Sequence, residues 1–281
     1  MNIDLHCHSN ISDGKLPPDQ LVQAALNNGA ELLALTDHDH IGGLSLAQKT
    51  AHRLGLAFIN GVEISVSWRS RNIHIVGLNF TPTDELEKTL HINRQGRFSR
   101  LEKIAERLEK KLSVKNIVQG ALSFANSPDS VSRTHIAQYL VQQCVVENAQ
   151  QAFKKYLGDG KIGDIKHQWI SLEQAVLAII NASGVAVIAH PARYKISATA
   201  MRNLIEEFKT YGGQAIEIAT PVHSLNERLN LTLLANRYDL YASAGSDFHG
   251  NGEFGRIIGQ TPDLPVTCRP VWDLFSNVQA A

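Results

Sequence analysis

The chain has 281 residues, about the size of one α/β barrel, and its hydrophobic fraction of 43% is enough for a full core. Lys and Arg together number 27, as do Asp and Glu, so no overall charge favours nucleic acid or a membrane surface. The three cysteines, Cys7, Cys144 and Cys268, are far apart, which excludes a disulfide framework and a cysteine zinc site.

The first residues, MNIDLHCHSN, lack the basic start and the apolar stretch of a signal peptide. No apolar run along the chain reaches the length of a membrane span. We therefore expect a cytoplasmic protein with no membrane partner, and no motif indicates an obligate protein partner.

Short apolar runs alternate with helical patterns over most of the chain. The expected strands are residues 3–5, 32–35, 57–59, 73–78, 185–189, 215–218 and 241–244. The expected helices between them are residues 17–28, 44–54, 172–181, 198–211 and 224–236. This alternation is typical of parallel strands with helices packed outside them, so we predict an α/β fold.

The alternation stops between residues 84 and 166, where only helical patterns occur. These patterns cover residues 85–112, 116–124, 133–142 and 148–157, and clusters of β-branched residues are absent. We predict an all-helical insertion of residues 84–166 that covers one face of a barrel formed by residues 1–83 and 167–281. The alternative is a set of ordinary barrel helices with strands that the pattern misses.

Histidines and carboxylates follow nearly every expected strand. His6 and His8 are two residues apart at the end of the first strand, so their side chains share a face. The C-terminal ends of parallel strands meet at one rim of a barrel, where catalytic side chains collect. The candidate metal ligands are His6, His8, Asp13, His38, Glu63, His74, His190, Asp247 and His249.

This concentration of imidazoles and carboxylates indicates several divalent metal ions, of which Mn²⁺, Fe²⁺ and Zn²⁺ suit these ligands. Cations would also relieve the repulsion between carboxylates in one pocket. A turn at residues 68–72 would join two antiparallel segments and place Glu63 almost opposite His74. A single buried histidine is more often a hydrogen-bonded core residue, so the metal hypothesis depends on the whole set.

Residues next to these candidates are expected to have other roles. Asp37 and Asp39 would orient the neighbouring histidines, and His40 would flank the site. Cys7 would pack on the opposite face of the first strand. The histidines in helical patterns, expected at the surface, are His52, His91 and His223.

These motifs resemble those of the PHP (polymerase and histidinol phosphatase) superfamily. The similar segments are HCH at 6–8 with Asp13, TDHD at 36–39, GVE at 61–63, HIVG at 74–77, AHP at 189–191 and SDFHG at 246–250. SRTHIA at 132–137, HQW at 167–169 and HPARYK at 190–195 resemble a subfamily of nucleotide phosphatases and 5′-to-3′ exoribonucleases with a helical insert. One departure is that His40 and Ile41 follow TDHD, where a smaller residue is expected first.

The resemblance implies a distorted (β/α)₇ barrel that holds three divalent metals, with Mn²⁺ favoured over Fe²⁺ or Zn²⁺. The first metal would be bound by His6, His8, Glu63 and Asp247, the second by Glu63, His74 and His190, and the third by Asp13, His38 and His249. The residues with implied catalytic roles are Asp13, His38, Glu63, His190 and Asp247. A metal pair bridged by Glu63 would activate a water for in-line attack on phosphorus.

We expect the substrate phosphates to contact Arg133, His135, Arg193 and Lys195. The alternative for each is a solvated surface charge, and Arg193 could equally pair with a carboxylate. The expected reaction is hydrolysis of the 3′ phosphate ester of a 5′-phosphorylated nucleotide. Its substrate would be a 3′,5′-bisphosphonucleotide or a short 5′-phosphorylated RNA, with ribosomal RNA 5′-end maturation as one candidate role.

Three other functions are compatible with parts of the pattern. A phosphomonoesterase of the same family, acting on AMP or another small molecule, would use the same ligands. An amidohydrolase also begins with HxH on its first strand, although the TDHD segment fits it poorly. A metal-binding regulatory domain without activity would not need a full ligand set.

Overall fold

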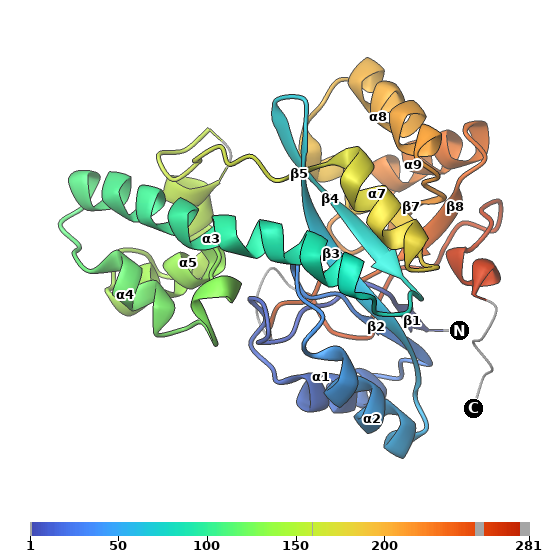
Figure 1. Ribbon diagram of the computed structural model, residues 1–281, viewed down its shortest axis with the longest axis horizontal. Coiled ribbons are helices and arrows are strands. Elements are labelled where there is room, and N and C mark those ends of the chain that lie inside the picture. Colours follow the sequence, from blue (N-terminus) through green and yellow to red (C-terminus); the bar gives the residue numbers. More distant parts are fainter. Residues whose placement is uncertain (1, 159, 251–255, 276–281) are drawn as a thin grey trace.

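The computed structural model describes residues 2–158, 160–250 and 256–275, and its centre is a mixed sheet (Figure 1). Along the sheet the strand order is β1-β2-β3-β4-β6-β7-β8, and the short β5 pairs with β3 outside this path. The strands are β1 (Ile3–Asp4), β2 (Leu32–Leu35), β3 (Ala57–Trp68), β4 (Arg71–Leu78), β5 (Ile170–Ser171), β6 (Val185–Ile188), β7 (Ala215–Ala219) and β8 (Tyr241–Ala244).

Backbone hydrogen bonds join the first and last strands of this path. The Leu5 amide donates to the Ala244 carbonyl at 3.0 Å, and the His8 amide donates to the Phe248 carbonyl at 2.9 Å. Cys7 and Phe248 form a parallel bridge between the same segments. β4 is antiparallel to both of its neighbours, whereas the other neighbouring pairs on the path are parallel. The result is the predicted α/β fold, a distorted seven-stranded barrel.

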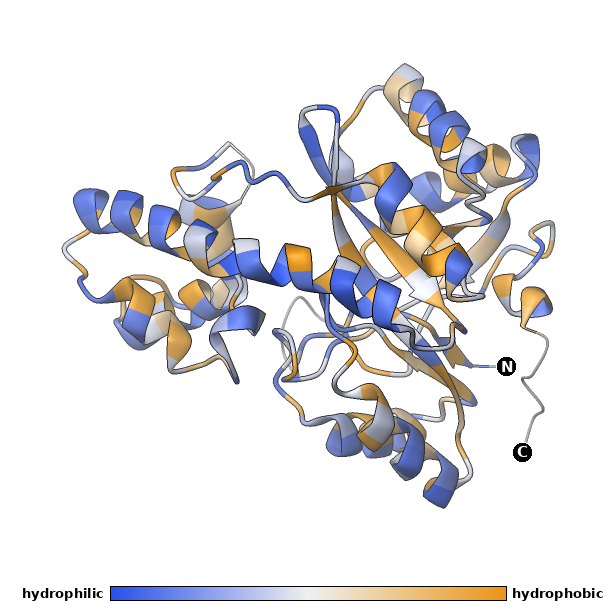
Figure 2. Ribbon diagram, in the orientation of Figure 1, coloured by the Kyte–Doolittle hydropathy of each residue, from blue (hydrophilic) through white to orange (hydrophobic). Residues whose placement is uncertain are grey.

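Five helices cover the outside of the barrel. They are α1 (Pro18–Asn27), α2 (Leu44–Leu54), α7 (Leu172–Asn181), α8 (Ala198–Thr210) and α9 (Leu225–Arg237). In Figure 2 the strands are mainly hydrophobic, and the helices carry hydrophilic residues on their outward faces. The cluster between sheet and helices includes Val62 and Ile64 of β3, which alternate with the inward residues of that strand.

The inside of the barrel is apolar at one end and polar at the other. Ile59 of β3 and Leu78 of β4 belong to the inner apolar cluster, which the C-terminal turn Val271–Leu274 also contacts. Because side chains on one face of a strand recur every second residue, Glu63 and His74 share the inward faces of these two strands. The polar end therefore begins where the inward side chains of β3 and β4 change from apolar to ionisable.

The segment between β4 and β5 consists of helices. They are α3 (Asp84–Lys111), α4 (Ile117–Leu122), the 3₁₀ turn Pro128–Ser130, α5 (Arg133–Gln142), α6 (Ala149–Ala152) and the π-helical turn Phe153–Leu157. In Figure 1 the helices α4 and α5 lie beside the far end of α3, away from the barrel. The buried members of their hydrophobic cluster all lie between Leu101 and Ile165.

α3 divides its packing between the two parts. Leu86 and Leu90 are fully buried in the cluster between sheet and helices, whereas Leu101 and Ile104 belong to the second cluster. The boundaries predicted for the insertion, residues 84–166, remain a prediction. The packing indicates that the first half of α3 belongs to the barrel core.

The predicted hairpin forms, but its register differs from the expectation. Ser65 pairs with His74, and Glu63 pairs with Val76, so Glu63 is two residues from the position directly opposite His74. A shift of two keeps both side chains on the same face, and they still meet. β3 also runs to Trp68, well past the predicted end at residue 59, so Glu63 lies within a strand. Among the described helices, none has the length and apolarity of a membrane span.

Candidate metal centre

All nine candidate ligands lie together at the polar end of the barrel. Their donor atoms form four overlapping sets of neighbours, which contain the members of the three ligand groups expected from the sequence. In the first group, Glu63 Oε2 lies 3.4 Å from His6 Nε2 and 3.3 Å from His8 Nε2. Asp247 Oδ1 lies 3.7 Å and 3.5 Å from the same two nitrogens. Ligand atoms bound at about 2.1 Å to one ion are roughly 3–3.5 Å apart, so this spacing suits a shared cation.

The second group forms around the other oxygen of Glu63. Oε1 lies 2.7 Å from His74 Nδ1 and 2.8 Å from His190 Nε2. His38 Nδ1 is 2.9 Å from Oε2, so the Glu63 carboxylate contacts five imidazoles in all. This is the geometry expected of a carboxylate between two cation positions.

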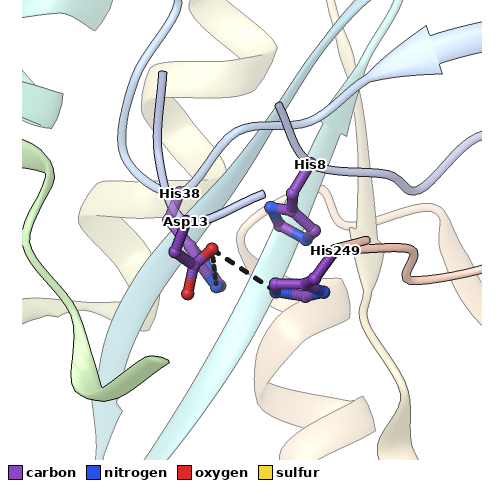
Figure 3. A group of neighbouring side chains, drawn as sticks. All are labelled: His8, Asp13, His38 and His249. Carbon is purple, nitrogen blue, oxygen red and sulfur yellow. Dashed lines mark ion pairs between the residues drawn. The ribbon is translucent and has the colours of Figure 1, made fainter. Parts of the chain in front are cut away.

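The third group contains Asp13, His38 and His249, with His8 beside them (Figure 3). Asp13 Oδ1 lies 3.4 Å from His249 Nε2 and 3.8 Å from His38 Nε2. The side chains come from three different loops and point toward one another. This set of donor atoms shares His38 and His8 with the contacts of Glu63.

Several donor atoms are buried without a hydrogen-bond partner in the part of the chain that the structure describes. They include His6 Nε2, His8 Nε2, Asp13 Oδ1 and Glu63 Oε2. A buried polar atom without a partner is costly, and such atoms are rare in folded proteins. Nitrogen and carboxylate donors that converge in this way fit divalent metal ions.

Electrostatics keep two of the histidines, His8 and His190, in the neutral form that binds metal. Burial lowers the pKa of His8 to about 3, with His249 and His38 contributing. Burial also lowers the pKa of His190 to about 4. Both imidazoles are therefore neutral near pH 7, as a ligand must be.

The Glu63 carboxylate is also held in its ionised form, whereas three other histidines are favoured in the protonated form. Burial would lower the pKa of His6 and of His249, but Glu217 and Glu63 raise that of His6 and Asp13 raises that of His249. Burial would raise the pKa of Glu63, but His74, His38 and His6 outweigh it and hold that pKa well below its usual range. Burial would lower the pKa of His38, but Glu63 and Asp13 raise it to about 9. A cation among these carboxylates would replace the proton on His38.

Glu217 is part of this site but was not among the predicted residues. Its Oε1 lies 3.0 Å from His6 Nδ1, and its Oε2 accepts a hydrogen bond of 2.6 Å from the His190 amide. A carboxylate on Nδ1 leaves Nε2 of His6 directed at the cation position. The available signal was an acidic residue within the apolar run AIEIA of residues 215–219.

Two of the neighbouring acids have different partners from those expected. Asp37 accepts hydrogen bonds from Ser9 and Ser12, and Asp39 accepts them from Ser65, Asn93 and Arg97. The expectation that they orient the neighbouring histidines is therefore wrong, because they fix backbone segments around the site instead.

The other neighbours mostly follow the expectation. The buried Cys7 thiol donates to the Ala34 carbonyl within the core, and His52 and His91 are exposed. His40 flanks the site and accepts from the Gly42 amide. The prediction that His223 lies at the surface is wrong. This residue is 4% exposed, and its Nδ1 lies 3.1 Å from the Ile218 carbonyl oxygen.

A cavity of about 310 Å³ lies between the ligand groups and the helical segment. Its lining includes five arginines, Arg97, Arg100, Arg133, Arg193 and Arg256, of which only Arg133 and Arg193 were predicted. Arg193 Nη1 lies 2.7 Å from Asp247 Oδ2, so the pairing with a carboxylate occurs. The Arg193 side chain is nevertheless 49% exposed.

The remaining two predicted substrate contacts are placed elsewhere. His135 is buried, and its Nδ1 accepts from the Ser132 amide. Lys195 is exposed, and neither residue is among the described residues that line the cavity. The helical segment also contributes the apolar lining residues Leu101, Ile104, Val131, Ile136 and Phe153. The cavity therefore combines metal-binding groups with cationic and apolar side chains.

Comparison with known proteins gives consistent matches over nearly the full chain. The family model described as the PHP domain matches residues 4–221. A 3′,5′-nucleoside bisphosphate phosphatase from Chromobacterium violaceum is 46% identical over 272 residues, covering 96% of this chain and 95% of that protein. A 5′-3′ exoribonuclease from Haemophilus influenzae is 42% identical over 274 residues, covering 97% and 98%.

The same fold occurs in a solved structure from Chromobacterium violaceum, described as an amidohydrolase with bound sulfate and no metal. Its TM-score is 0.93 at 45% identity, covering 98% of this chain and 96% of that chain.

Proposed function

The chain belongs to the PHP domain family, and from this premise we propose that it hydrolyses the 3′ phosphate ester of 5′-phosphorylated nucleotides. It is a hydrolase of phosphate esters, as its relatives' names indicate. The observation that carries the proposal is that overlapping groups of imidazole and carboxylate donor atoms, most of them buried, lie next to a cavity lined by five arginines. Such a cavity suits a substrate with more than one anionic group.

The proposed centre holds three divalent ions, with Mn²⁺ favoured. The proposed ligands are His6, His8, Glu63 and Asp247 for the first ion, Glu63, His74 and His190 for the second, and Asp13, His38 and His249 for the third. When bound, these ions supply Lewis acidity that activates water and neutralises phosphate oxygens. Glu63 would connect the ligand groups, because its Oε1 faces His74 and His190 whereas its Oε2 faces His6, His8 and His38.

The arginines of the cavity are proposed to bind the phosphates of the substrate. Arg193 lies next to Asp247, within the first group, so it can contact the phosphate that reacts. Arg133 lies across the cavity on α5, where it can contact the 5′-phosphate. The apolar lining residues of the helical segment provide a surface for the sugar and base. One binding geometry then serves two substrates, because the 3′ ester ends in a free phosphate in a bisphosphonucleotide and leads to the next nucleotide in RNA.

The 5′-phosphate requirement tests this proposal directly. We expect an RNA oligonucleotide of five residues with a 5′-phosphate to release its first nucleotide with Mn²⁺ present. The matched oligonucleotide with a 5′-hydroxyl should react at least about tenfold more slowly, because it lacks charge-assisted bonds worth roughly 1.5–3 kcal/mol. 3′,5′-Bisphosphoadenosine and AMP complete the panel. Equal rates on both oligonucleotides, or initial release from the 3′ end, would contradict the proposal.

Replacement of Glu63 tests the bridging role. We expect E63Q to lose activity and more than one equivalent of metal, since its carboxylate faces two groups. Elemental analysis of metal-saturated, dialysed protein measures this loss. Full occupancy in E63Q would show that Glu63 is not a bridge.

The same experiments discriminate the alternatives. A phosphomonoesterase of small molecules would hydrolyse AMP and leave the oligonucleotides intact. The amidohydrolase alternative, suggested by the description of the similar structure, predicts turnover of cyclic amides rather than phosphate esters. A non-catalytic domain would bind Mn²⁺ without turnover of any of these compounds. The cytoplasmic location expected from the sequence remains a prediction.

A further inference from the structure

The loop that carries Asp13 is held from two sides. From the barrel, the Asp37 carboxylate accepts hydrogen bonds from the Ser9 amide at 2.8 Å and the Ser12 hydroxyl at 2.6 Å. From the helical segment, the Asn126 side chain donates to the Asn10 carbonyl. The loop is therefore in contact with a segment that lies more than one hundred residues later in the chain.

The two carboxylate oxygens of Asp13 have different surroundings. Oδ2 accepts hydrogen bonds from the Ser132 and Thr134 hydroxyls, each at 2.9 Å. Oδ1 is buried without a hydrogen-bond partner among the described residues and lies 3.4 Å from His249 Nε2. The helical segment thus saturates one oxygen, and the other faces the third group of donor atoms.

Helix capping accounts for only one of these two hydroxyls. Ser132 is the N-cap of α5, and its Oγ accepts from the Thr134 amide at 3.0 Å. The Thr134 hydroxyl has no part in this cap, and it donates to Asp13 from a residue that is only 9% exposed. Its contact therefore indicates a function in the site.

We infer that Ser132 and Thr134 are positioning residues that orient Asp13 toward the cation of the third group. The helical segment is in this sense part of the metal centre, in addition to covering it. The inference rests on the proposed metal centre. The ion of the third group would therefore depend on contacts from outside the barrel.

The variant T134V tests this inference because valine keeps the shape of threonine and leaves the Ser132 cap in place. We expect metal-saturated T134V to retain about one equivalent of Mn²⁺ less than the wild type after dialysis. In titrations of metal-free protein, followed by the electron paramagnetic resonance signal of free Mn²⁺, the weakened site should bind roughly 10- to 100-fold less tightly. T134S restores the hydroxyl and should bind as the wild type does.

The matched control is S130A, which removes a buried hydroxyl that donates to the Ser127 carbonyl in the same segment. It should leave the Mn²⁺ content unchanged. S132A provides a second test if T134V does not fold, as judged by circular dichroism. Wild-type Mn²⁺ content and affinity in T134V, or in S132A, would overturn the inference. If T134V loses Mn²⁺ and the wild type hydrolyses no phosphate ester, the inference holds and the proposed function fails.

Discussion

At the scale of single residues, the carboxylates of the site divide into those that face the cation positions and those that hold the histidines. Glu63 belongs to the first kind. Its backbone is fixed because β3 pairs with β4 on one side and contacts His38 on the other. Glu217 belongs to the second kind, and it connects His6 of the first group with the backbone of His190 of the second group.

Replacement of Glu217 should separate metal affinity from turnover. In E217Q the amide can accept from only one of the two donors, so His6 or His190 loses a buried partner. We expect the affinity for Mn²⁺ to fall roughly 10- to 100-fold, with kcat restored at saturating Mn²⁺. The control is E207Q, which weakens a hydrogen bond from Trp68 on the outside of the barrel. Unchanged Mn²⁺ affinity in E217Q would refute the positioning role.

The nine candidate ligands could be predicted because each one follows or lies in a strand, where local spacing determines the face. Glu217 could not be predicted in this way, since its role depends on partners from other segments of the chain. Glu217 and His6 are 211 residues apart in the chain. Ser132 and Thr134 were covered by a resembling motif, but their partner Asp13 belongs to a different segment.

At the scale of elements, α3 is the connection between the barrel and the rest of the helical segment. Its first half contributes Leu86 and Leu90 to the barrel core, and the Asn93 side chain donates to the Ser65 carbonyl. Sequence patterns predicted the helix but could not show this division, because both halves carry apolar residues at helical spacing. The register of the β3–β4 hairpin was similarly beyond the pattern, since the position of the turn determines it.

Two deletions should therefore differ in outcome. Removal of residues 101–164 eliminates most of the second cluster. The two residues that flank this deletion are in contact, because the Arg100 side chain donates through Nε to the Ile165 carbonyl at 3.0 Å. We expect a folded barrel that has lost nucleotide affinity and the cation next to Asp13. Removal of residues 86–166 also deletes Leu86 and Leu90, each worth about 2–5 kcal/mol of stability, and should give unfolded protein. Circular dichroism, nucleotide titration and metal analysis measure these outcomes; equal stability of both products would contradict the assigned division.

At the scale of the whole molecule, metal binding and stability are coupled. The donor atoms are buried, and the unfolded chain cannot bring them together. One ion at a free concentration one hundred times its Kd contributes about 2.7 kcal/mol. For a chain of this size this corresponds to a Tm difference of roughly 5–10 °C.

We therefore expect removal of metal by chelation to lower the Tm by at least that amount and readdition of Mn²⁺ to restore it. Differential scanning calorimetry on chelated and reloaded samples measures the change. A control with Mg²⁺ at the same concentration should restore less of the lost Tm, because Mg²⁺ prefers oxygen ligands to imidazoles. Identical melting of the chelated and reloaded protein would exclude this coupling.

The bonds that close the barrel have a consequence for how the chain folds. β1 and β8 meet along a seam between segments 240 residues apart, and such long-range pairing is slow to form. His6 and His8 come from one side of this seam, and Asp247 and His249 come from the other. The first and third cation positions therefore cannot exist before the seam closes. An ion at either position would connect the segment after β1 with the segment after β8. The rate of metal uptake during refolding should therefore follow the rate at which β1 and β8 pair.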